Sequence, residues 1–204
     1  SFIGWSRIAD ALPNAGHAAL AEAERVGRIG TLITQNVDRL HQAAGSQQVI
    51  DLHGRLDMVR CMGCELRISR QDMDEMLQAL NPSIRKDDTF EFTPDGDAEV
   101  EVAPNFVVPT CPSCGGILKP DVVFFGESVP TDRVDEAMNA LAEAEALLVA
   151  GTSLAVNSGM RFARAAAKSG KPIVVVNVGQ TKADELALAK IEANTSLALP
   201  LLLL

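Results

Sequence analysis

The 204-residue sequence has few aromatic residues, no long apolar run and fewer basic than acidic side chains. Aromatic residues make up 4% of the chain, although 47% of all residues are hydrophobic. The formal net charge of −9 argues against a nucleic-acid or anionic-membrane surface, because phosphate binding needs a basic stripe. No apolar segment approaches the length of a membrane span. We therefore expect no nucleic-acid partner and no membrane association, and a basic protein partner fits this charge better.

Both common phosphate-binding motifs are also missing. No Gly-x-Gly-x-x-Gly follows a predicted strand, and no Walker-type Gly-Lys-Ser/Thr is present. In a doubly wound nucleotide-binding fold the phosphate loop follows the first strand. The sequence starts at Ser1 without a methionine, so we expect this loop upstream, with a trimmed native terminus as the alternative. No basic-then-apolar signal segment opens the sequence, which predicts an intracellular protein.

Alternating helical and strand patterns predict an α/β fold. Residues 15–26 have helical spacing of apolar side chains and end at Gly27, and residues 28–34 follow as a strand. A helix at 130–144, a strand at 146–150, a helix at 158–168 and a strand at 173–176 continue the pattern. We predict a doubly wound, mostly parallel Rossmann-like sheet whose first strand and glycine loop are missing from this sequence.

All four cysteines lie in two Cys-x-x-Cys pairs, formed by Cys61 with Cys64 and by Cys111 with Cys114. Two intervening residues let one tight turn present both thiolates to one metal ion. Disulfides are unexpected in an intracellular chain, and a thioredoxin-like redox pair would open a helix, whereas two glycines follow Cys114. The spacing predicts one structural Zn²⁺ with four sulfur ligands.

The cysteine pairs lie in a segment that loses the regular alternation of strands and helices. Within it, residues 81–104 carry prolines, acidic residues and an Asp95-Gly96 turn signal, which predicts a long loop. We predict a small inserted zinc-ribbon module at 57–116 and a nucleotide-binding domain formed by 1–56 and 117–204.

Small polar residues follow three of the predicted strands. Gln35, Asn36 and Asp38 follow the first, and Gly151-Thr152-Ser153 and Asn177-Val178-Gly179 follow two later strands. Open α/β sheets bind ligands beyond the carboxyl ends of their strands. Glycine permits close approach of the backbone, and hydroxyl and amide groups can bind ribose or phosphate oxygens. Three such strand ends predict a nucleotide cleft.

His53 follows a short apolar run at 49–52 and precedes Gly54. A neutral imidazole at a strand end can take a proton from a hydroxyl near neutral pH, and a purely structural histidine is the alternative. Residues 119–127 are apolar and β-prone. They predict either an edge to which an extended peptide adds a strand or an ordinary core strand.

These motifs together resemble the sirtuin family over nearly the whole chain. They comprise Thr34-Gln35-Asn36-Val37-Asp38, Leu52-His53-Gly54, the two cysteine pairs, residues 119–127, Gly151-Thr152-Ser153 and Asn177-Val178-Gly179. The Pro13-Asn14 and His17 motif, together with Ser158-Gly159-Met160-Arg161-Phe162, resembles the class II branch. That branch includes bacterial proteins and an animal mitochondrial member. The family's Gly-Ala-Gly-x-Ser loop has no counterpart in this sequence.

The resemblance implies an NAD-dependent protein-lysine deacylase that produces nicotinamide, free lysine and O-acyl-ADP-ribose. The acyl-lysine carbonyl oxygen displaces nicotinamide in this family, and a histidine matching His53 then deprotonates a ribose hydroxyl. The alternatives are a mono-ADP-ribosyltransferase and a non-catalytic, zinc-stabilised protein-binding module. The expected location is the cytoplasm for a bacterial protein and the mitochondrial matrix for a eukaryotic one.

The resemblance also assigns residues to ligands. The NAD-binding residues it implies are Gln35, Asn36, Val37, Asp38, Gly151, Thr152, Ser153, Asn177, Val178, Gly179 and Thr195. The substrate-peptide residues it implies are Val122, Val123, Phe124, Phe125, Gly126, Glu127 and Val156, with the wall near Val156 reaching Ser158. Acyl-lysine proteins or peptides are therefore the expected partners, and an acidic surface suits a lysine-rich target.

Overall fold

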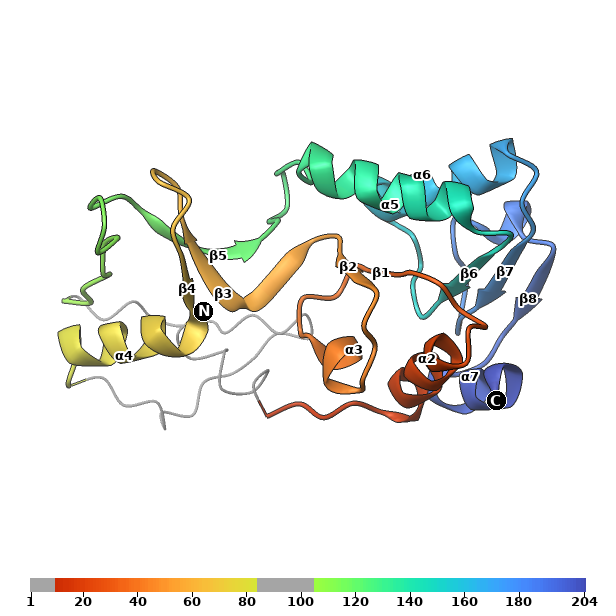
Figure 1. Cartoon of the computed structure of the whole chain (residues 1–204), viewed down its shortest axis with the longest axis horizontal. Coiled ribbons are helices and arrows are strands. Elements are labelled where there is room, and N and C mark those ends of the chain that lie inside the picture. The colour runs from red at the N-terminus through yellow and green to blue at the C-terminus, as the bar shows by residue number, and fades with distance from the viewer. Residues whose placement is uncertain (1–9, 84–104) are drawn as a thin grey trace. The chain divides into compact units, whose positions relative to one another are not determined.

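The computed structural model describes residues 10–83 and 105–204 (Figure 1). The predicted Asp95-Gly96 turn and most of the predicted loop around it lie outside the described residues. The chain divides into two compact units. The smaller unit includes residues 10–11, Val37–Arg39 and Gly54–Val122, and the larger one contains Leu12–Asn36, Leu40–His53 and Val123–Leu204.

The larger unit contains two parallel sheets. In one sheet β1 (Leu32–Thr34) pairs with β2 (Val49–Asp51), and the other has the order β6 (Leu147–Ala150), β7 (Ile173–Val176), β8 (Ala189–Ile191). The parallel pairing agrees with the predicted α/β fold. Parallel strands carry their carboxyl ends to the same edge of a sheet, so this pairing decides where the polar residues after each strand gather.

The predicted strand at 28–34 is wrong in its first half, because β1 begins only at Leu32. The backbone N–H groups of Arg28 and Ile29 both donate to the Ala23 carbonyl, at 2.8 and 3.2 Å. These bonds close the end of the preceding helix, so the two donors are not available to a strand ladder. Local helix termination therefore overrides the β-prone composition of this segment.

The preceding helix, α2 (Ala15–Arg25), has signals for both of its ends in the sequence. The Asn14 side chain accepts hydrogen bonds from the N–H groups of Gly16 and His17, at 2.9 and 3.2 Å. Gly27 then takes a φ of +75°, a left-handed conformation that ends the helix. The remaining helices of this unit are α3 (Leu40–Ala43), α5 (Thr131–Glu143), α6 (Asn157–Lys168), α7 (Thr195–Leu203) and the 3₁₀ turn η1 (Asp184–Leu186). α2 packs beside α7 (Figure 1).

The core of the larger unit lies between its strands and helices α5 and α6. α6 contributes buried residues at helical spacing, among them Met160, Ala163 and Ala166. The complete cluster comprises Ile50, Leu52, Ala137, Leu141, Val149, Leu154, Met160, Phe162, Ala163, Ala166, Ile173, Val175 and Ala183. This cluster joins residues of both parallel sheets, so it fixes the ends of β1, β2, β6 and β7 within one packed body.

The smaller unit is an antiparallel sheet with the order β4 (Arg67–Ser69), β3 (Gly54–Cys61), β5 (Leu118–Val122), together with helix α4 (Arg70–Leu80). The sequence analysis did not predict β4 or α4. Ser69 caps α4 by accepting the Asp72 N–H at 3.0 Å. Gly54 has a φ of +87°, and a Cβ there would lie 2.0 Å from the Asp121 carbonyl oxygen, so the β3–β5 pairing requires glycine.

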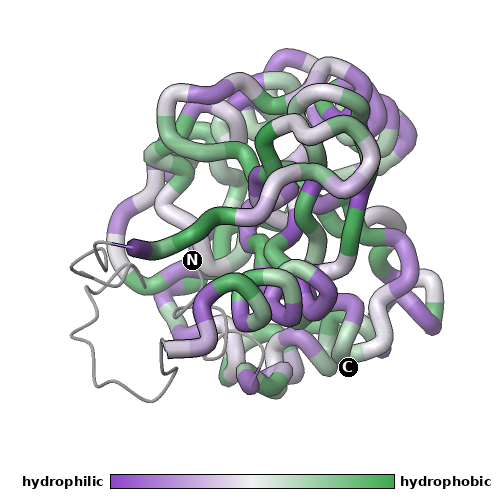
Figure 2. The backbone as a smooth tube through the Cα atoms, turned by 90° about the vertical axis from the view of Figure 1, so that its left-hand side faces the viewer, coloured by the Kyte–Doolittle hydropathy of each residue, from purple (hydrophilic) through white to green (hydrophobic). Residues whose placement is uncertain are grey.

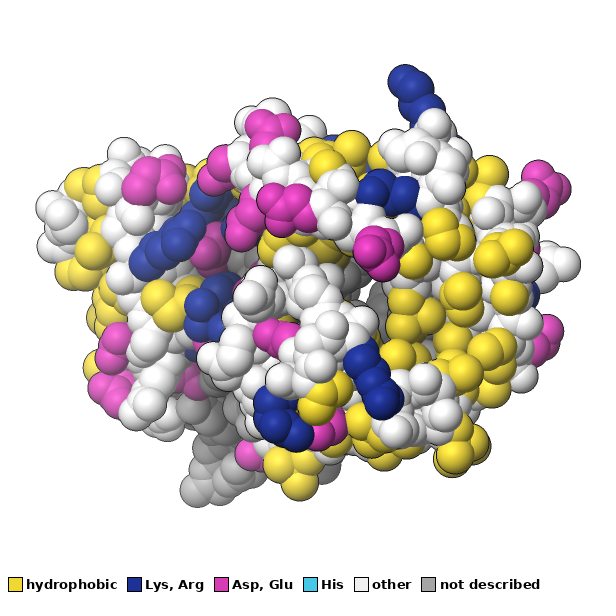
Figure 3. Space-filling model, turned by 45° about the vertical axis from the view of Figure 1, so that its right-hand side comes forward, with side chains coloured by type: hydrophobic (Ala, Val, Ile, Leu, Met, Phe, Trp, Pro, Cys, Tyr) yellow, Lys and Arg dark blue, Asp and Glu magenta, His cyan; other side chains and the backbone are white. Residues whose placement is uncertain are grey.

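None of the helices in the described ranges is long and apolar enough to cross a membrane. Along the backbone, hydrophobic residues are interspersed with hydrophilic ones (Figure 2). The surface nevertheless carries exposed leucines, such as Leu188 at 76% exposure and Leu201 in α7 at 87%. Figure 3 shows hydrophobic side chains gathered on the right-hand part of one face.

We predict that Ile173→Ala destabilises the protein by about 2–5 kcal/mol, because it leaves a cavity in the core of the larger unit. Ile173 is 1% exposed and belongs to the central strand β7. The control Leu188→Ala removes an exposed side chain and should change the free energy of unfolding by about 0.5 kcal/mol or less. Urea unfolding measures both values, and equal values for the two variants would contradict this placement of the core.

Candidate functional site

The pairing of β1 with β2 places His53 beside Gln35. Thr34 lies opposite Asp51, and the Leu52 N–H extends the ladder by donating to the Thr34 carbonyl at 2.9 Å. The next residue, His53, then has its Nδ1 atom 3.1 Å from the Gln35 carbonyl oxygen. Because a carbonyl oxygen only accepts, Nδ1 carries the hydrogen in this contact. In the neutral ring the lone pair is therefore on Nε2, the nitrogen suited to act as a base.

The surroundings of His53 favour its neutral form. Desolvation by burial lowers its pKa below the ordinary value, the hydrogen bond to the Gln35 carbonyl partly offsets this shift, and the charge of Arg133 lowers the pKa further. Arg133 on α5 reaches the same strand end, with Nη1 3.4 Å from the Leu52 carbonyl oxygen. The imidazole is consequently unprotonated at neutral pH and available to accept a proton.

The ends of β1 and β6 meet through the side chains of Gln35 and Thr152. Gln35 Nε2 donates to Thr152 Oγ1 at 3.0 Å, and the Leu154 N–H donates to the same oxygen at 3.1 Å. Both acceptor positions of the Thr152 hydroxyl are therefore filled, and its hydrogen remains to donate to an oxygen of a ligand. Leu154 takes a φ of +51°, uncommon for a non-glycine residue, and this places its N–H next to Thr152.

The ends of β6 and β7 gather several of the residues assigned to NAD. Gly151 has a φ of +64°, and a Cβ there would lie 3.3 Å from the Thr195 methyl carbon, so Thr195 lies directly beside it. The Asn177 amide donates to the carbonyls of Val178 and Gly179, at 2.8 and 3.2 Å. These donors hold the turn after β7, so the side-chain oxygen of Asn177 is the atom left to meet a ligand.

Three further NAD-assigned residues follow Gln35. Asn36 belongs to the larger unit and is exposed, and its backbone N–H donates to the Thr34 hydroxyl at 3.1 Å. Val37 and Asp38 belong to the smaller unit, where the Val37 carbonyl accepts the Leu56 N–H at 2.9 Å. The residues predicted as a polar cluster after the first strand therefore divide between the two units, with Gln35 and Asn36 in the larger one and Asp38 in the smaller one.

Residues 119–127 were predicted as a peptide-binding edge or a core strand, but the strand ends at Val122, the last residue of β5. The Val123 N–H donates to the His53 carbonyl at 2.8 Å, so the segment leaves β5 beside the imidazole-bearing residue. Phe124 is 50% exposed and Phe125 is 99% exposed, which contradicts a core strand at these positions. The Glu127 carboxylate accepts the Phe124 N–H at 2.9 Å and closes a turn.

Val156 is the remaining residue that the resemblance assigns to the substrate peptide. It precedes α6 and is 45% exposed. No sequence motif indicated Arg133, which lowers the pKa of His53. Ser158 was predicted only as part of a family motif and of the substrate wall near Val156, although Ser158 Oγ lies 2.8 Å from His53 Nε2. Neither contact leaves a local sequence signal, because helices remote in sequence bring the side chains to the strand end.

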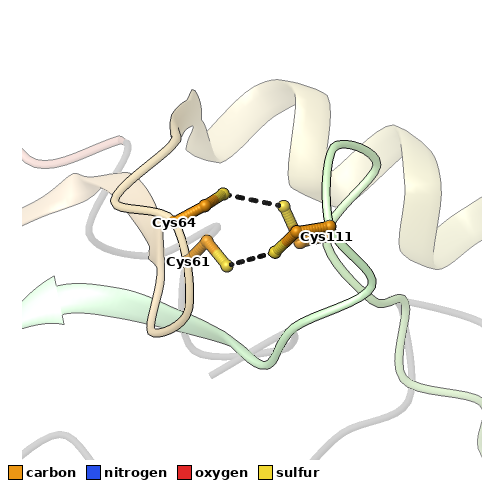
Figure 4. A group of neighbouring side chains, drawn as sticks. Cys61, Cys64 and Cys111 are labelled. Carbon is orange, nitrogen blue, oxygen red and sulfur yellow. Dashed lines mark hydrogen bonds between the residues drawn. The ribbon is translucent and has the colours of Figure 1, made fainter.

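The four cysteines of the smaller unit form a compact cluster (Figure 4). All four Sγ atoms lie within 4.8 Å of one another, with Cys61 3.5 Å from Cys114 and Cys64 3.7 Å from Cys111. Zn–S bonds of about 2.3 Å in a tetrahedron give sulfur separations of about 3.8 Å, whereas a disulfide needs about 2.05 Å. The donor set fits one Zn²⁺ with every coordination position taken by sulfur, which makes the site structural.

The backbone around the cysteines is arranged to stabilise thiolates. The N–H groups of Gly63 and Cys64 lower the pKa of the Cys61 thiol to about 6, and the Gly63 nitrogen lies 3.2 Å from Cys61 Sγ. A zinc ligand must be a thiolate, so the lowered pKa of Cys61 favours metal binding. At the Cys114 thiol the hydrogen bond from the Gly116 N–H is instead outweighed by hydrogen bonds with the other cysteines, which raise its pKa to about 12. Gly116 lies close to two of the sulfurs, because a Cβ there would lie 3.0 Å from Cys61 Sγ and 3.2 Å from Cys114 Sγ.

We predict that the protein binds about one zinc ion per chain and that Cys64→Ser abolishes stoichiometric binding, because three thiolates leave the tetrahedron open. The smaller unit should then unfold while the larger unit keeps its core. Metal analysis combined with limited proteolysis measures both effects. Ser113→Ala, which changes an exposed residue of the second pair's turn, serves as the control and should retain the ion. A metal-free wild-type protein with an intact smaller unit would contradict the zinc assignment.

The charge of Arg133 gives a second prediction. Removing it by Arg133→Gln should raise the pKa of His53, since a nearby positive charge disfavours the imidazolium. NMR titration of the imidazole should show a wild-type midpoint below the ordinary value of about 6.5 and a higher midpoint in the variant. The exposed residue Arg164 on α6 provides the control Arg164→Gln, for which the midpoint should not move. Identical midpoints in all three proteins would contradict the role of Arg133.

Known proteins of one family are similar to this chain. The model of the Sir2 family matches residues 3–158. An "NAD-dependent protein deacetylase" of Xanthomonas campestris pv. campestris (strain 8004) is 54% identical over 204 residues, covering 99% of this chain and 69% of that protein.

Two solved structures have similar folds. "Sir2-p53 peptide-NAD+" superposes with a TM-score of 0.77 and 32% identity, covering 95% of this chain and 70% of that one. "Sir2 bound to acetylated peptide" gives a TM-score of 0.78 and 31% identity with the same coverage. The family model spans most of the sequence, and the relative is identical to this chain at more than half of the 204 aligned positions. On these grounds the chain belongs to the Sir2 family.

Proposed function

We propose that the protein is an NAD-dependent protein-lysine deacylase. The observation that carries the proposal is the His53 imidazole, held by the Gln35 carbonyl with its lone pair on Nε2 and kept neutral by burial and Arg133. The family membership and the deacetylase relative support the same activity. Bacterial relatives of this kind also support a cytoplasmic location as part of the proposal.

The residues at the ends of β6 and β7 fit a dinucleotide. Gly151 leaves room for close backbone approach, the Thr152 hydroxyl has a hydrogen to donate, and the Asn177 side-chain oxygen can accept from a ribose hydroxyl. When bound, NAD supplies a ribose carbon that reacts with the acyl oxygen as nicotinamide leaves. We assign Gln35, Asn36 and Asp38 to the nicotinamide and its ribose, as the resemblance to sirtuins implies.

His53 acts on a proton in this proposal. Its Nε2 atom takes a hydrogen from a ribose hydroxyl, and the resulting positive charge is shared with Nδ1, which already donates to the Gln35 carbonyl. That carbonyl therefore holds the ring before the transfer and stabilises the imidazolium after it. The low starting pKa keeps the base ready at neutral pH.

The substrate in this proposal is a peptide or protein that carries an acyl-lysine. Residues 123–127 follow β5 and carry two exposed phenylalanines, and Val156 adds a third exposed apolar side chain. Apolar walls of this kind suit the alkyl chain of an acylated lysine, whose charge has been removed. The excess of acidic residues in the chain favours substrates rich in unmodified lysine. The zinc ion holds the smaller unit together and takes no part in the reaction.

We predict that His53→Ala lowers the rate of NAD-dependent deacylation at least about 100-fold, the usual contribution of a general base. Nicotinamide release and mass spectrometry of acetyl-, propionyl- and longer-acyl-lysine peptides measure the rate and the preferred acyl group. Zinc content and melting temperature should match the wild type, which separates a chemical effect from unfolding.

Three outcomes would contradict the proposal. An undiminished rate in His53→Ala would remove the base assignment. ADP-ribose attached to protein in place of O-acyl-ADP-ribose would indicate a transferase, and a folded, zinc-loaded wild-type protein that releases no nicotinamide with any peptide would indicate a binding module.

A further inference from the structure

Both nitrogens of the His53 imidazole have a hydrogen-bonding partner. Nδ1 lies 3.1 Å from the Gln35 carbonyl oxygen, and Nε2 lies 2.8 Å from Ser158 Oγ. Because the carbonyl contact assigns the hydrogen to Nδ1, the neutral Nε2 accepts, and the Ser158 hydroxyl donates to it. The serine therefore occupies the lone pair that the proposed reaction uses.

Ser158 reaches this position because the start of α6 packs tightly on the end of β1. Gly159 is buried, and a Cβ there would lie 2.8 Å from Gln35 Oε1, so a side chain at 159 would displace the Gln35 amide. Met160 and Phe162, also on α6, anchor the helix in the core. One residue, Gln35, thus contacts the helix through its side chain and the imidazole through its carbonyl.

This packing orients the ring from two elements that are far apart in the sequence. A single hydrogen bond at Nδ1 leaves the imidazole free to swing about that contact, whereas a second bond at Nε2 fixes the plane of the ring. The Ser158 hydroxyl can also turn about its Cβ–Oγ bond. It can therefore release the lone pair to an incoming hydroxyl and then accept from the protonated Nε2.

We propose that Ser158 is a positioning residue, whose hydroxyl holds the His53 ring with Nε2 directed toward the proton that it removes. This inference rests on the proposed function, and it adds a role that the substrate-wall assignment of the Val156–Ser158 loop does not contain. If a bound peptide displaces this loop, the hydrogen bond from Ser158 to His53 changes, and the orientation of the imidazole changes with it.

The test compares Ser158→Ala with Ser158→Thr, which keeps a hydroxyl at the same position. Ser158→Ala should lower kcat about 10-fold while KM for NAD stays within about twofold, because ring orientation affects proton transfer more than binding. Ser158→Thr should restore most of the rate. Ser169→Ala removes an exposed hydroxyl at the opposite end of α6 and should leave kcat unchanged.

A second measurement does not depend on turnover. In the ¹H–¹⁵N spectrum of the NAD-free protein, the His53 Nε2 resonance should shift downfield in Ser158→Ala, as a lone pair loses its donor, and keep its position in Ser158→Thr and Ser169→Ala. An unmoved resonance together with wild-type kcat in Ser158→Ala would overturn the inference, as would a rate loss that threonine does not restore. Absence of turnover in the wild type would refute the proposed function alone, since the spectrum still decides whether Ser158 holds the ring.

Discussion

The parallel pairing of β1 with β2 is the constraint on which the proposed active site depends. With Leu32 opposite Val49, the ladder ends so that the Gln35 carbonyl meets His53 Nδ1. A shift of one residue in this register would turn His53 to the opposite face of the sheet. The proton position on the imidazole thus follows from strand register, because a backbone carbonyl selects the tautomer.

Backbone conformation has the same importance at the ends of β6 and β7. Gly151 and Leu154 both take positive φ, and the turn between them directs the Leu154 N–H to the Thr152 hydroxyl. The Asn177 amide holds the neighbouring turn through two carbonyls. These bonds hold each turn and leave the Thr152 hydroxyl hydrogen and the Asn177 side-chain oxygen for a ligand. If NAD binds there as proposed, the preformed turns limit the entropy lost on binding.

The smaller unit depends on its metal site for stability, because its hydrophobic core is small. Its core is a short cluster around Val59, Met73 and Leu77, to which two of the cysteines contribute. A closed four-sulfur site adds free energy that so small a core does not supply, and it does so without an open coordination position. In the proposed function the metal therefore stabilises the smaller unit, and the His53 imidazole of the larger unit carries the chemistry.

The sequence by itself determined the features that depend on near neighbours. Two-residue spacing within each cysteine pair predicted the metal cluster, Gly27 marked the end of α2, and apolar runs before small polar residues located the strand ends. The strand prediction failed at Arg28 and Ile29, because closure of the end of α2 uses the backbone donors that a strand ladder would need. Only the tertiary structure brought Ser158 to His53 across 105 residues, and Arg133 to the Leu52 carbonyl across 81. Such contacts arise from helix packing on a shared core, which no local pattern of residues encodes.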